Sequence, residues 1–236
     1  MTQSIALVTG ASKGIGLEIV RQLSQQNIKV LLAARSLEQA QQAVAQLVQD
    51  GLDVEAVQLE VTNSQHIQAL VQHIQDTYGK LDILVNNAGV LLERGNYDED
   101  AFRDTLEVNT LAPFYLTEAL LPLLLNSPAG RIVNQSSAIG SIYLQLNEPL
   151  VQQLAKPGYA VSKAALNMLT AYWSQQYSHT PLKVNSVHPG LVKTQMGGEE
   201  APVSIEDGAK TAVHFATLPS DGPTGTFYHL DQQLPW

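Results

Sequence analysis

The stretch IALVTGASKGIG, residues 5–16, decides the fold class of this chain. Its first four residues are apolar and match a short buried strand, and a helical pattern follows over about residues 15–26. The glycines between them have the spacing Gly-x-x-x-Gly-x-Gly. Gly10 permits a tight turn, and Gly14 and Gly16 let the backbone approach a bound group. A glycine-rich turn between a strand and a helix N-terminus is typical of a phosphate-binding α/β fold.

Strand-like and helical patterns alternate along the rest of the chain. We expect strands at about residues 5–8, 29–33, 54–59, 83–85, 131–134, 184–187 and 226–230. A long helix is expected over residues 99–125, and other helices start near Ser36 (a capping box with Gln39), Ser64 and Ser204. This alternation predicts a parallel sheet covered on both faces. We therefore expect one Rossmann-like domain over residues 1–236, a three-layer α/β/α sandwich with a mostly seven-stranded parallel sheet.

Composition narrows the classes of function. The chain is acidic, with a formal net charge of −9, which disfavours non-specific binding to nucleic acid or to anionic membranes. It contains no cysteine, which excludes disulfides, thiolate catalysis and cysteine zinc sites, and its histidines lack metal-ligand spacing. Neither a leader pattern at the start nor an apolar run of about 20 residues is visible. We expect a cytoplasmic protein with no metal, nucleic-acid or membrane partner.

Tyr159 and Lys163 form the most informative pair of side chains. They lie four residues apart in a helical pattern, so the phenol and the ammonium group share one helix face. A phenol titrates near pH ~10, and a nearby cation lowers that pKa towards the range useful for proton transfer. The alternative is a half-buried helix tyrosine beside a solvated lysine. The pair therefore gains weight only from the motifs around it.

The second expected strand ends in Ala33-Ala34-Arg35-Ser36, without an acidic residue. Dinucleotide folds selective for NAD usually place an acid here to bind the ribose 2′-hydroxyl. Arg35, together with Lys13 in the glycine-rich turn, instead suits a 2′-phosphate. The sequence therefore favours NADP(H) over NAD(H), with two solvated surface charges as the alternative.

Several further motifs follow in a fixed order. Asn86-Asn87-Ala88-Gly89 comes after the fourth expected strand, Asn109 lies in the long helix, and Ser137 follows the fifth strand. Pro189-Gly190 and Thr194 follow the sixth. With the glycine-rich turn and the Tyr159 pair, this chain resembles the short-chain dehydrogenase/reductase family over nearly its whole length. The spacing after Ser204 and the interval before Tyr159 resemble the carbonyl-reductase branch.

The resemblance implies a role for each motif residue. Tyr159 would be the proton donor, Lys163 would lower its pKa and bind the nicotinamide ribose, and Ser137 would hold the substrate carbonyl. Asn109 would kink its helix and hold a water for a proton relay. Residues 1–135 would mainly bind the cofactor and residues 136–236 would carry catalysis and substrate binding. The implied cofactor site comprises Gly10, Ser12, Lys13, Gly14, Ile15, Gly16, Arg35, Glu60, Val61, Asn87, Ala88, Gly89, Tyr159, Lys163, Pro189, Gly190, Val192 and Thr194.

Two departures from the family pattern bear on these roles. Glu60 stands where the family usually has an aspartate for the adenine amine. The interval from Ser137 to Tyr159 is 22 residues, longer than is common, and its content is largely apolar. This segment, residues 138–157, could line the substrate pocket, cover the helices used for family dimers, or do both. The oligomeric state therefore stays open between a monomer, a homodimer and a homotetramer.

The function that follows is an NADP(H)-dependent oxidoreductase that reduces a small carbonyl compound, an aldehyde, ketone or quinone, to an alcohol. Two alternatives stay open. One is a sensor that keeps the fold and binds NADP(H) without turnover, and the other is an NAD-dependent alcohol dehydrogenase of the same fold. The substrate itself is not specified by these motifs, because specificity in such folds lies in the irregular segments.

Overall fold

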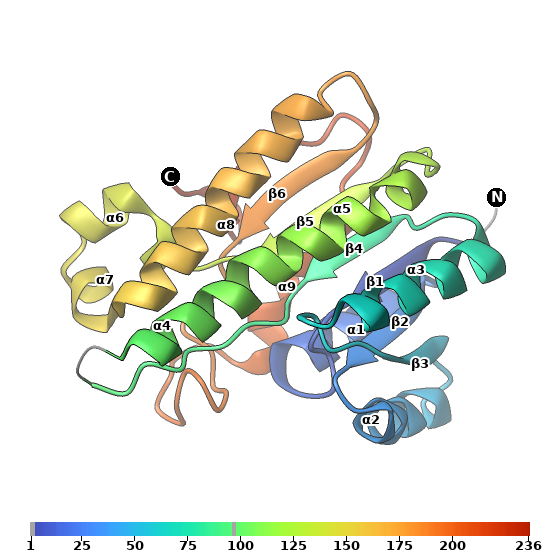
Figure 1. Ribbon diagram of the computed structural model, residues 1–236, viewed down its shortest axis with the longest axis horizontal. Coiled ribbons are helices and arrows are strands. Elements are labelled where there is room, and N and C mark those ends of the chain that lie inside the picture. Colours follow the sequence, from blue (N-terminus) through green and yellow to red (C-terminus); the bar gives the residue numbers. More distant parts are fainter. Residues whose placement is uncertain (1–2, 96–97) are drawn as a thin grey trace.

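The protein forms a three-layer α/β/α sandwich, here in a computed structural model that describes residues 3–95 and 98–236. Figure 1 shows the sheet in the middle, with helices in front of it and behind it. Met1 and Thr2, on which the expectation about a leader partly rests, lie outside the described residues. The predicted Rossmann-like architecture is confirmed.

The described residues form one sheet of eight strands, with the order β3-β2-β1-β4-β5-β6-β7-β8. Pairing is parallel except between the last two strands. Each predicted strand is present within two residues of its expected bounds. The strands are β1 (Ile5–Val8), β2 (Lys29–Ala34), β3 (Val54–Gln58), β4 (Ile83–Asn86), β5 (Arg131–Gln135), β6 (Lys183–Val187), β7 (Phe227–His229) and β8 (Gln232–Gln233).

The expectation of seven strands misses β8. This strand has two polar, exposed residues and pairs antiparallel with β7. A two-residue turn joins the two strands, and Leu230 adopts a left-handed φ of 52° there. A strand this short has no apolar alternation by which the sequence could reveal it.

Helices cover both faces of the sheet because every central strand is buried on both sides. One core cluster packs against α1 (Gly14–Ser24), α2 (Leu37–Gln49) and α9 (Ile205–Ala216). The other packs against α3 (Ser64–Tyr78), α5 (Ala112–Leu125) and α8 (Pro157–Gln176). The central strands therefore contribute side chains to both hydrophobic cores, one on each face of the sheet.

Side chains cap the helix starts much as expected. Ser36 Oγ accepts a hydrogen bond from Gln39 N at 3.4 Å, and Ser204 Oγ accepts one from Asp207 N at 3.0 Å. Helix α3 begins at Ser64, as expected, and Asn63 is its N-cap. Its side chain accepts from two backbone N–H groups, as an N-cap residue does.

The long helix expected over residues 99–125 is present, with an irregular turn in its middle. The structure has α4 (Glu99–Leu106), a π-helical turn η1 (Glu107–Leu111) and then α5. π-turns of this kind commonly mark functional positions in helices. By length and composition the run Glu99–Leu125 could cross a membrane, because an 18-residue window within it has a mean hydropathy of 1.3. However, 56% of that window is buried inside the protein. A core helix passes the same test, so the run is weak evidence for a membrane span.

The segment between Ser137 and Tyr159 folds into three short helices: η2 (Ala138–Gly140), α6 (Ile142–Asn147) and α7 (Pro149–Leu154). In Figure 1, α6 and α7 lie beside the N-terminal part of α8, on the side away from α5. The chain's end fastens them, because Tyr143 N donates to Trp236 O at 3.1 Å and Ser141 Oγ donates to Pro235 O at 2.7 Å. The segment is therefore anchored to the C-terminal residues.

A buried arginine connects several loops at the amino end of β5. Arg131, at the start of β5, is 3% exposed. Its guanidinium donates five hydrogen bonds, at 2.7–3.2 Å, to the backbone carbonyls of Leu218, Gly130, Pro181 and Pro219. Burial lowers the pKa of Arg131, but the five donors match five carbonyl contacts.

We expect Arg131→Met to reduce the free energy of unfolding by about 3 kcal/mol, because it leaves several buried carbonyls without a donor. Urea denaturation measures this loss. Arg103→Met is the matched control: Arg103 pairs with Glu99 on the surface of α4, with side chains 71% and 60% exposed. Its loss should cost no more than about 0.5 kcal/mol, and equal losses in the two variants would contradict a special role for Arg131.

Candidate active site

The predicted site residues gather at the carboxyl ends of β1, β4, β5 and β6. In a parallel sheet these ends share one edge, and the strand order reverses between β1 and β4. The residues following these strands are the glycine-rich turn, Asn87 to Gly89, Ser137 and Pro189 to Thr194. The structure therefore brings together, on one edge, motifs spread over most of the chain.

The glycine-rich turn is held against the end of β4 by a small set of hydrogen bonds. Thr9 Oγ1 accepts from the backbone N–H groups of Asn87 at 3.0 Å and Ala88 at 2.9 Å. The Asn87 side chain donates back to Thr9 O at 2.8 Å and Gly10 O at 3.2 Å. These bonds leave no room for a side chain at Gly10, whose added Cβ would lie 2.8 Å from Ala88 Cα.

The glycines form a cradle of the kind that a phosphate group fits. Gly10 and Gly14 adopt left-handed φ values of 61° and 60°, and Gly16 lies so close to the Asn87 amide that a Cβ there would collide with it. The turn leads directly into α1, whose first N–H groups and dipole favour an anion. The residues present thus fit the pyrophosphate of a dinucleotide.

We expect Gly10→Ala to destabilise the protein by about 2 kcal/mol more than Gly51→Ala, because both positions have a left-handed φ but only Gly10 is also crowded. Gly51 has a φ of 79° and nothing within 4 Å of an added Cβ. Thermal or urea unfolding measures both variants. Equal losses would mean that strain alone, and not the close approach to β4, requires glycine at position 10.

The loop after β6 closes back onto the glycine-rich turn. Gly190 has a φ of 86°, and Val192 forms an isolated bridge with Val203 that holds the loop together. Lys13 Nζ donates to Gln195 Oε1 at 2.9 Å across the two segments. An added Cβ at Gly14 would lie 3.8 Å from the Thr194 methyl group, which places both predicted cofactor segments in contact.

The two cations expected at a 2′-phosphate lie in different settings. Lys13 is exposed and uses one of its three donors on Gln195, so two remain. Arg35 is exposed at the end of β2, and its backbone carbonyl accepts from Gln58 Nε2 at 3.1 Å. Both side chains are accessible to a ligand, and their role in binding NADP(H) stays a prediction.

Glu60 and Val61 follow β3 but point different ways. Glu60 is partly exposed; its N–H donates to His66 Nδ1 at 3.1 Å, and its carboxylate accepts from Thr62 Oγ1 at 3.4 Å. Val61 is 7% exposed and packs in the core beneath the sheet. A side-chain contact with an adenine group is therefore open to Glu60, whereas Val61 would contribute its backbone.

The catalytic residues predicted from the sequence converge. The Ser137 side chain lies close enough to the Tyr159 phenol to oppose the rise in its pKa, and Lys163 Nζ lies 5.7 Å from the centre of the Tyr159 ring. Lys163 is 4% exposed and donates to Gln135 O at 2.8 Å. A Cβ at Gly89 would lie 3.5 Å from Lys163 Nζ and 3.3 Å from Asn109 Oδ1, so the predicted cofactor and catalytic groups meet at Gly89.

The pKa of Tyr159 is raised overall in this structure, and a lowering contribution from Lys163 stays a prediction. Burial raises the pKa of Tyr159 to about 12, and the nearby Ser137 side chain opposes the rise. Burial also lowers the pKa of Lys163 to about 8. The lysine points its ammonium group at the Gln135 carbonyl, and its charge does not outweigh the desolvation of the phenol.

Asn109 lies in the π-turn η1 and is fully buried. Its side-chain oxygen accepts from Val90 N at 2.8 Å, and its amide nitrogen donates to Val90 O at 2.8 Å and to Ser162 Oγ at 3.1 Å. The long helix is thus irregular at the asparagine that the sequence singled out. The amide fastens the loop after β4 to the helix that carries Tyr159, and its part in a proton relay stays a prediction.

Sequence reasoning missed three residues that contact the catalytic groups. Gln135 accepts the Lys163 bond through its carbonyl, Ser162 bonds Asn109, and Glu93 bonds the start of α8. Gln135 is 7% exposed, and within the described part of the chain both atoms of its side-chain amide are buried without a partner. Its position at the end of a buried strand, two residues before Ser137, is the one sequence signal that could have drawn attention to it.

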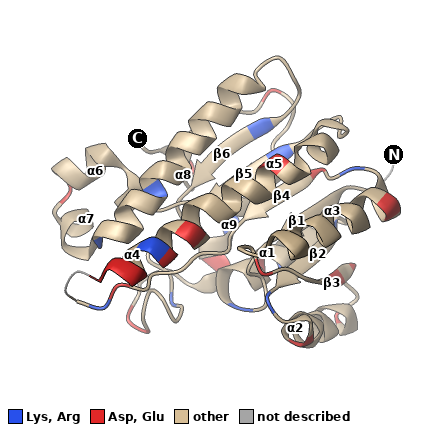
Figure 2. Ribbon diagram, in the orientation of Figure 1, with Lys and Arg blue, Asp and Glu red and all other residues tan. Residues whose placement is uncertain are grey.

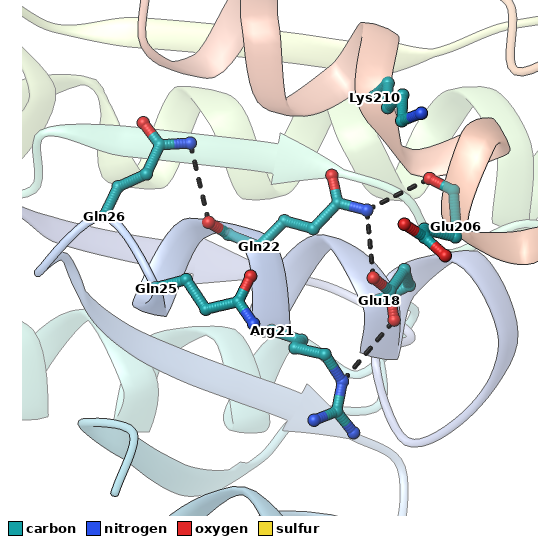
Figure 3. Close-up of a pocket in the computed structure, with 7 residues that line it drawn as sticks. All are labelled: Glu18, Arg21, Gln22, Gln25, Gln26, Glu206 and Lys210. Carbon is teal, nitrogen blue, oxygen red and sulfur yellow. Dashed lines mark hydrogen bonds and ion pairs between the residues drawn. The ribbon is translucent and has the colours of Figure 1, made fainter. Parts of the chain in front are cut away.

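An open groove of about 610 Å³ lies elsewhere, between α1 and α9. Figure 3 shows its long polar side chains bonding one another: Gln22 Nε2 donates to Glu18 Oε1 at 2.9 Å and to Glu206 O at 3.0 Å. None of the predicted site residues lines it. Its lining consists of surface side chains that pair with one another, and it holds none of the motif residues expected to act in catalysis. The carboxyl ends of the strands therefore remain the candidate active site.

Charge is spread rather than concentrated. Figure 2 shows lysines and arginines on several elements, interspersed with acidic residues. The acidic balance of the chain gives polyanions no general attraction. Within residues 3–95 and 98–236, no group of three or more histidine, aspartate or glutamate side chains is placed to hold a metal ion.

Comparisons with known proteins agree with this geometry. A family model for short chain dehydrogenase matches residues 4–203. The chain belongs to the short-chain dehydrogenase/reductase family. It is therefore an oxidoreductase of this family, as the order of its motifs predicts.

The similar proteins include reductases of small molecules. (−)-Isopiperitenone reductase of Mentha piperita is 33% identical, with 98% of each chain covered. Carbonyl reductase (NADPH) 1 of Sus scrofa is 34% identical, over 98% of this chain and 94% of that protein. A crystal structure of NADPH-bound carbonyl reductase from chicken fatty liver has a TM-score of 0.86 and 29% identity, with both chains fully covered.

Proposed function

We propose that this protein is an NADPH-dependent reductase that converts an uncharged aldehyde, ketone or quinone into an alcohol, with Tyr159 as the proton donor. The observation that carries the proposal is the convergence of Tyr159 with the Ser137 hydroxyl and the Lys163 ammonium group. Similarity to carbonyl reductases supports the class of substrate. The acidic surface favours substrates without negative charge.

The residues divide the reaction between them. NADPH, when bound, supplies the hydride that attacks the carbonyl carbon. Ser137 and Tyr159 donate hydrogen bonds to the carbonyl oxygen and so stabilise the charge that develops on it. Tyr159 then gives its proton to that oxygen, and the buried Lys163 charge stabilises the phenolate that remains. Asn109, fixed by three hydrogen bonds, holds the adjoining loop and helix in place.

The same arrangement accounts for the cofactor. Gly10, Gly14 and Gly16 would hold the pyrophosphate, and the free donors of Lys13 and the exposed Arg35 would meet a 2′-phosphate. The loop from Pro189 to Thr194 would hold the nicotinamide carboxamide. On this assignment residues 1–135 bind mainly the cofactor, whereas residues 136–236 carry catalysis and substrate recognition. The NADPH in the names of two similar reductases supports the choice of nucleotide.

The deciding experiment measures oxidation of NADPH by the purified protein with a panel of quinones, aromatic aldehydes and ketoesters, with NADH in parallel. We expect turnover with NADPH and tighter binding of NADPH than of NADH. Tyr159→Phe should lose nearly all turnover yet bind NADPH as wild type does, because only the donor proton is removed. Tighter binding of NADH would instead favour the NAD-dependent dehydrogenase. Tight NADPH binding without turnover of any substrate would favour a sensor.

The pH profile of carbonyl reduction should have an alkaline limb that belongs to Lys163. Tyr159, with a pKa raised to about 12, keeps its proton throughout the working range. Lys163, with a pKa lowered to about 8, loses its charge as the pH rises through that value, so kcat/KM should be level below it and fall above it. Lys163→Arg, which stays charged, should shift this limb to higher pH; an unmoved limb would assign it to another group.

A further inference from the structure

The helix that carries Tyr159 has no N-cap side chain that accepts hydrogen bonds from its first backbone N–H groups. Pro157 occupies its first position and has no N–H, and Ala160 N already donates to Lys156 O at 2.8 Å. Lys156, at the N-cap, makes no side-chain cap hydrogen bond. Two backbone donors of the first turn therefore need partners from elsewhere: those of Gly158 and Tyr159.

Glu93 supplies both partners from the loop after β4. Its Oε1 accepts from Gly158 N at 3.0 Å and its Oε2 accepts from Tyr159 N at 2.9 Å. Both oxygens of one carboxylate are used, and the negative charge lies at the positive end of a 20-residue helix. A residue 66 positions away in the sequence thus holds the backbone of the proposed proton donor.

Gly158 lets the carboxylate approach closely. A Cβ at position 158 would lie 3.0 Å from Glu93 Oε2 and 3.1 Å from Phe102 Cδ2. The φ of Gly158 is not left-handed, so the demand for glycine comes from the approach of the carboxylate and not from backbone strain. In Pro157-Gly158-Tyr159, two free backbone N–H groups and the absence of a side chain at Gly158 together allow an acidic side chain to bind.

The loop that carries Glu93 is fastened to the active site at its other end too. Val90 exchanges two hydrogen bonds of 2.8 Å with the side chain of Asn109. The four residues from Val90 to Glu93 therefore connect Asn109 to the backbone of Tyr159. A shift of this loop would move the phenol relative to the Ser137 hydroxyl.

We propose that Glu93 is a positioning residue, which fixes the start of α8 so that the Tyr159 hydroxyl stays in line for proton transfer. This inference rests on the proposed reductase function. Displacing a reacting group by about 1 Å can reduce the rate about 100-fold. Asn87 and Ala88, which precede Glu93 on the same loop, are held by their own hydrogen bonds to Thr9, so cofactor affinity should depend little on Glu93.

The test compares Glu93→Ala, Glu93→Gln and Asp98→Ala. Asp98 is the matched control, since its carboxylate caps α4 from the same loop by accepting from Ala101 N at 3.0 Å. We expect Glu93→Ala to lower kcat about 100-fold with an NADPH Kd within about twofold of wild type. Glu93→Gln keeps an acceptor for one N–H group and should show a smaller loss. Asp98→Ala should keep the wild-type kcat although it also loses a cap.

A second measurement does not depend on turnover. The phenol of Tyr159 is titrated by ultraviolet difference spectroscopy, with Tyr159→Phe as the blank. If Glu93 holds Tyr159 in its buried position, Glu93→Ala should move the pKa of Tyr159 down from about 12 towards the ordinary value of about 10, and Asp98→Ala should not. If Glu93→Ala does not fold, Glu93→Gln carries the comparison.

The outcomes separate the two proposals. An unchanged kcat and an unchanged Tyr159 titration in Glu93→Ala, with only a lower Tm, would overturn the positioning role and leave a plain helix cap. Wild-type protein that reduces no carbonyl compound would overturn the proposed function instead. The titration would then still decide whether Glu93 positions Tyr159.

Discussion

The structure depends on the close approach of two parallel strand ends at the point where the strand order reverses. At this point β1 and β4 are neighbours, and Gly10 lies directly against Ala88. The Thr9 hydroxyl and the Asn87 amide close the gap with four hydrogen bonds. This contact fixes the direction in which α1 leaves the sheet. It also lies at the carboxyl ends of β1 and β4, where α/β sheets bind ligands in a crevice. Every site residue further along the chain is placed relative to that crevice.

A buried polar chain on the opposite face then fixes α8. Asn86, at the end of β4, bonds Thr117 of α5 and Asn134 of β5, and Asn134 continues to Thr170 of α8. Polar groups without solvent are costly unless paired, so such a chain permits one register between neighbouring elements. Thr170 also bonds Ser186 of β6. The helix that carries Tyr159 and Lys163 is thereby locked in rotation along its middle, and Glu93 fixes its beginning. Two unrelated parts of the chain thus determine where the phenol lies.

The sequence predicts what is local and repeated, and it misses what is distant or brief. The strands β1, β2 and β4 could be located because they are apolar runs, mostly buried on both faces, and the motif residues follow the strands at fixed offsets. The strand Gln232–Gln233 carries no periodic signal, whereas the irregular turn at Asn109 is implied by the family resemblance rather than by periodicity. Glu93 was invisible because its partners lie 65 and 66 residues away, and a lone acid in a loop looks like any solvated one. The net pKa of Tyr159 could not be predicted, because helical spacing reveals which side chains share a face, whereas burial depends on the whole fold.

The protonation of Tyr159 bears on the direction of the reaction. A phenol whose pKa is raised to about 12 is protonated at neutral pH and is ready to give a proton to a carbonyl oxygen. Alcohol oxidation requires the reverse, a phenolate that accepts the proton, and burial makes that form costly. Lys163, whose own pKa is lowered to about 8, is still charged at neutral pH and can stabilise the phenolate once it forms. Burial thus favours the protonated phenol, which is the form that carbonyl reduction would use at its start.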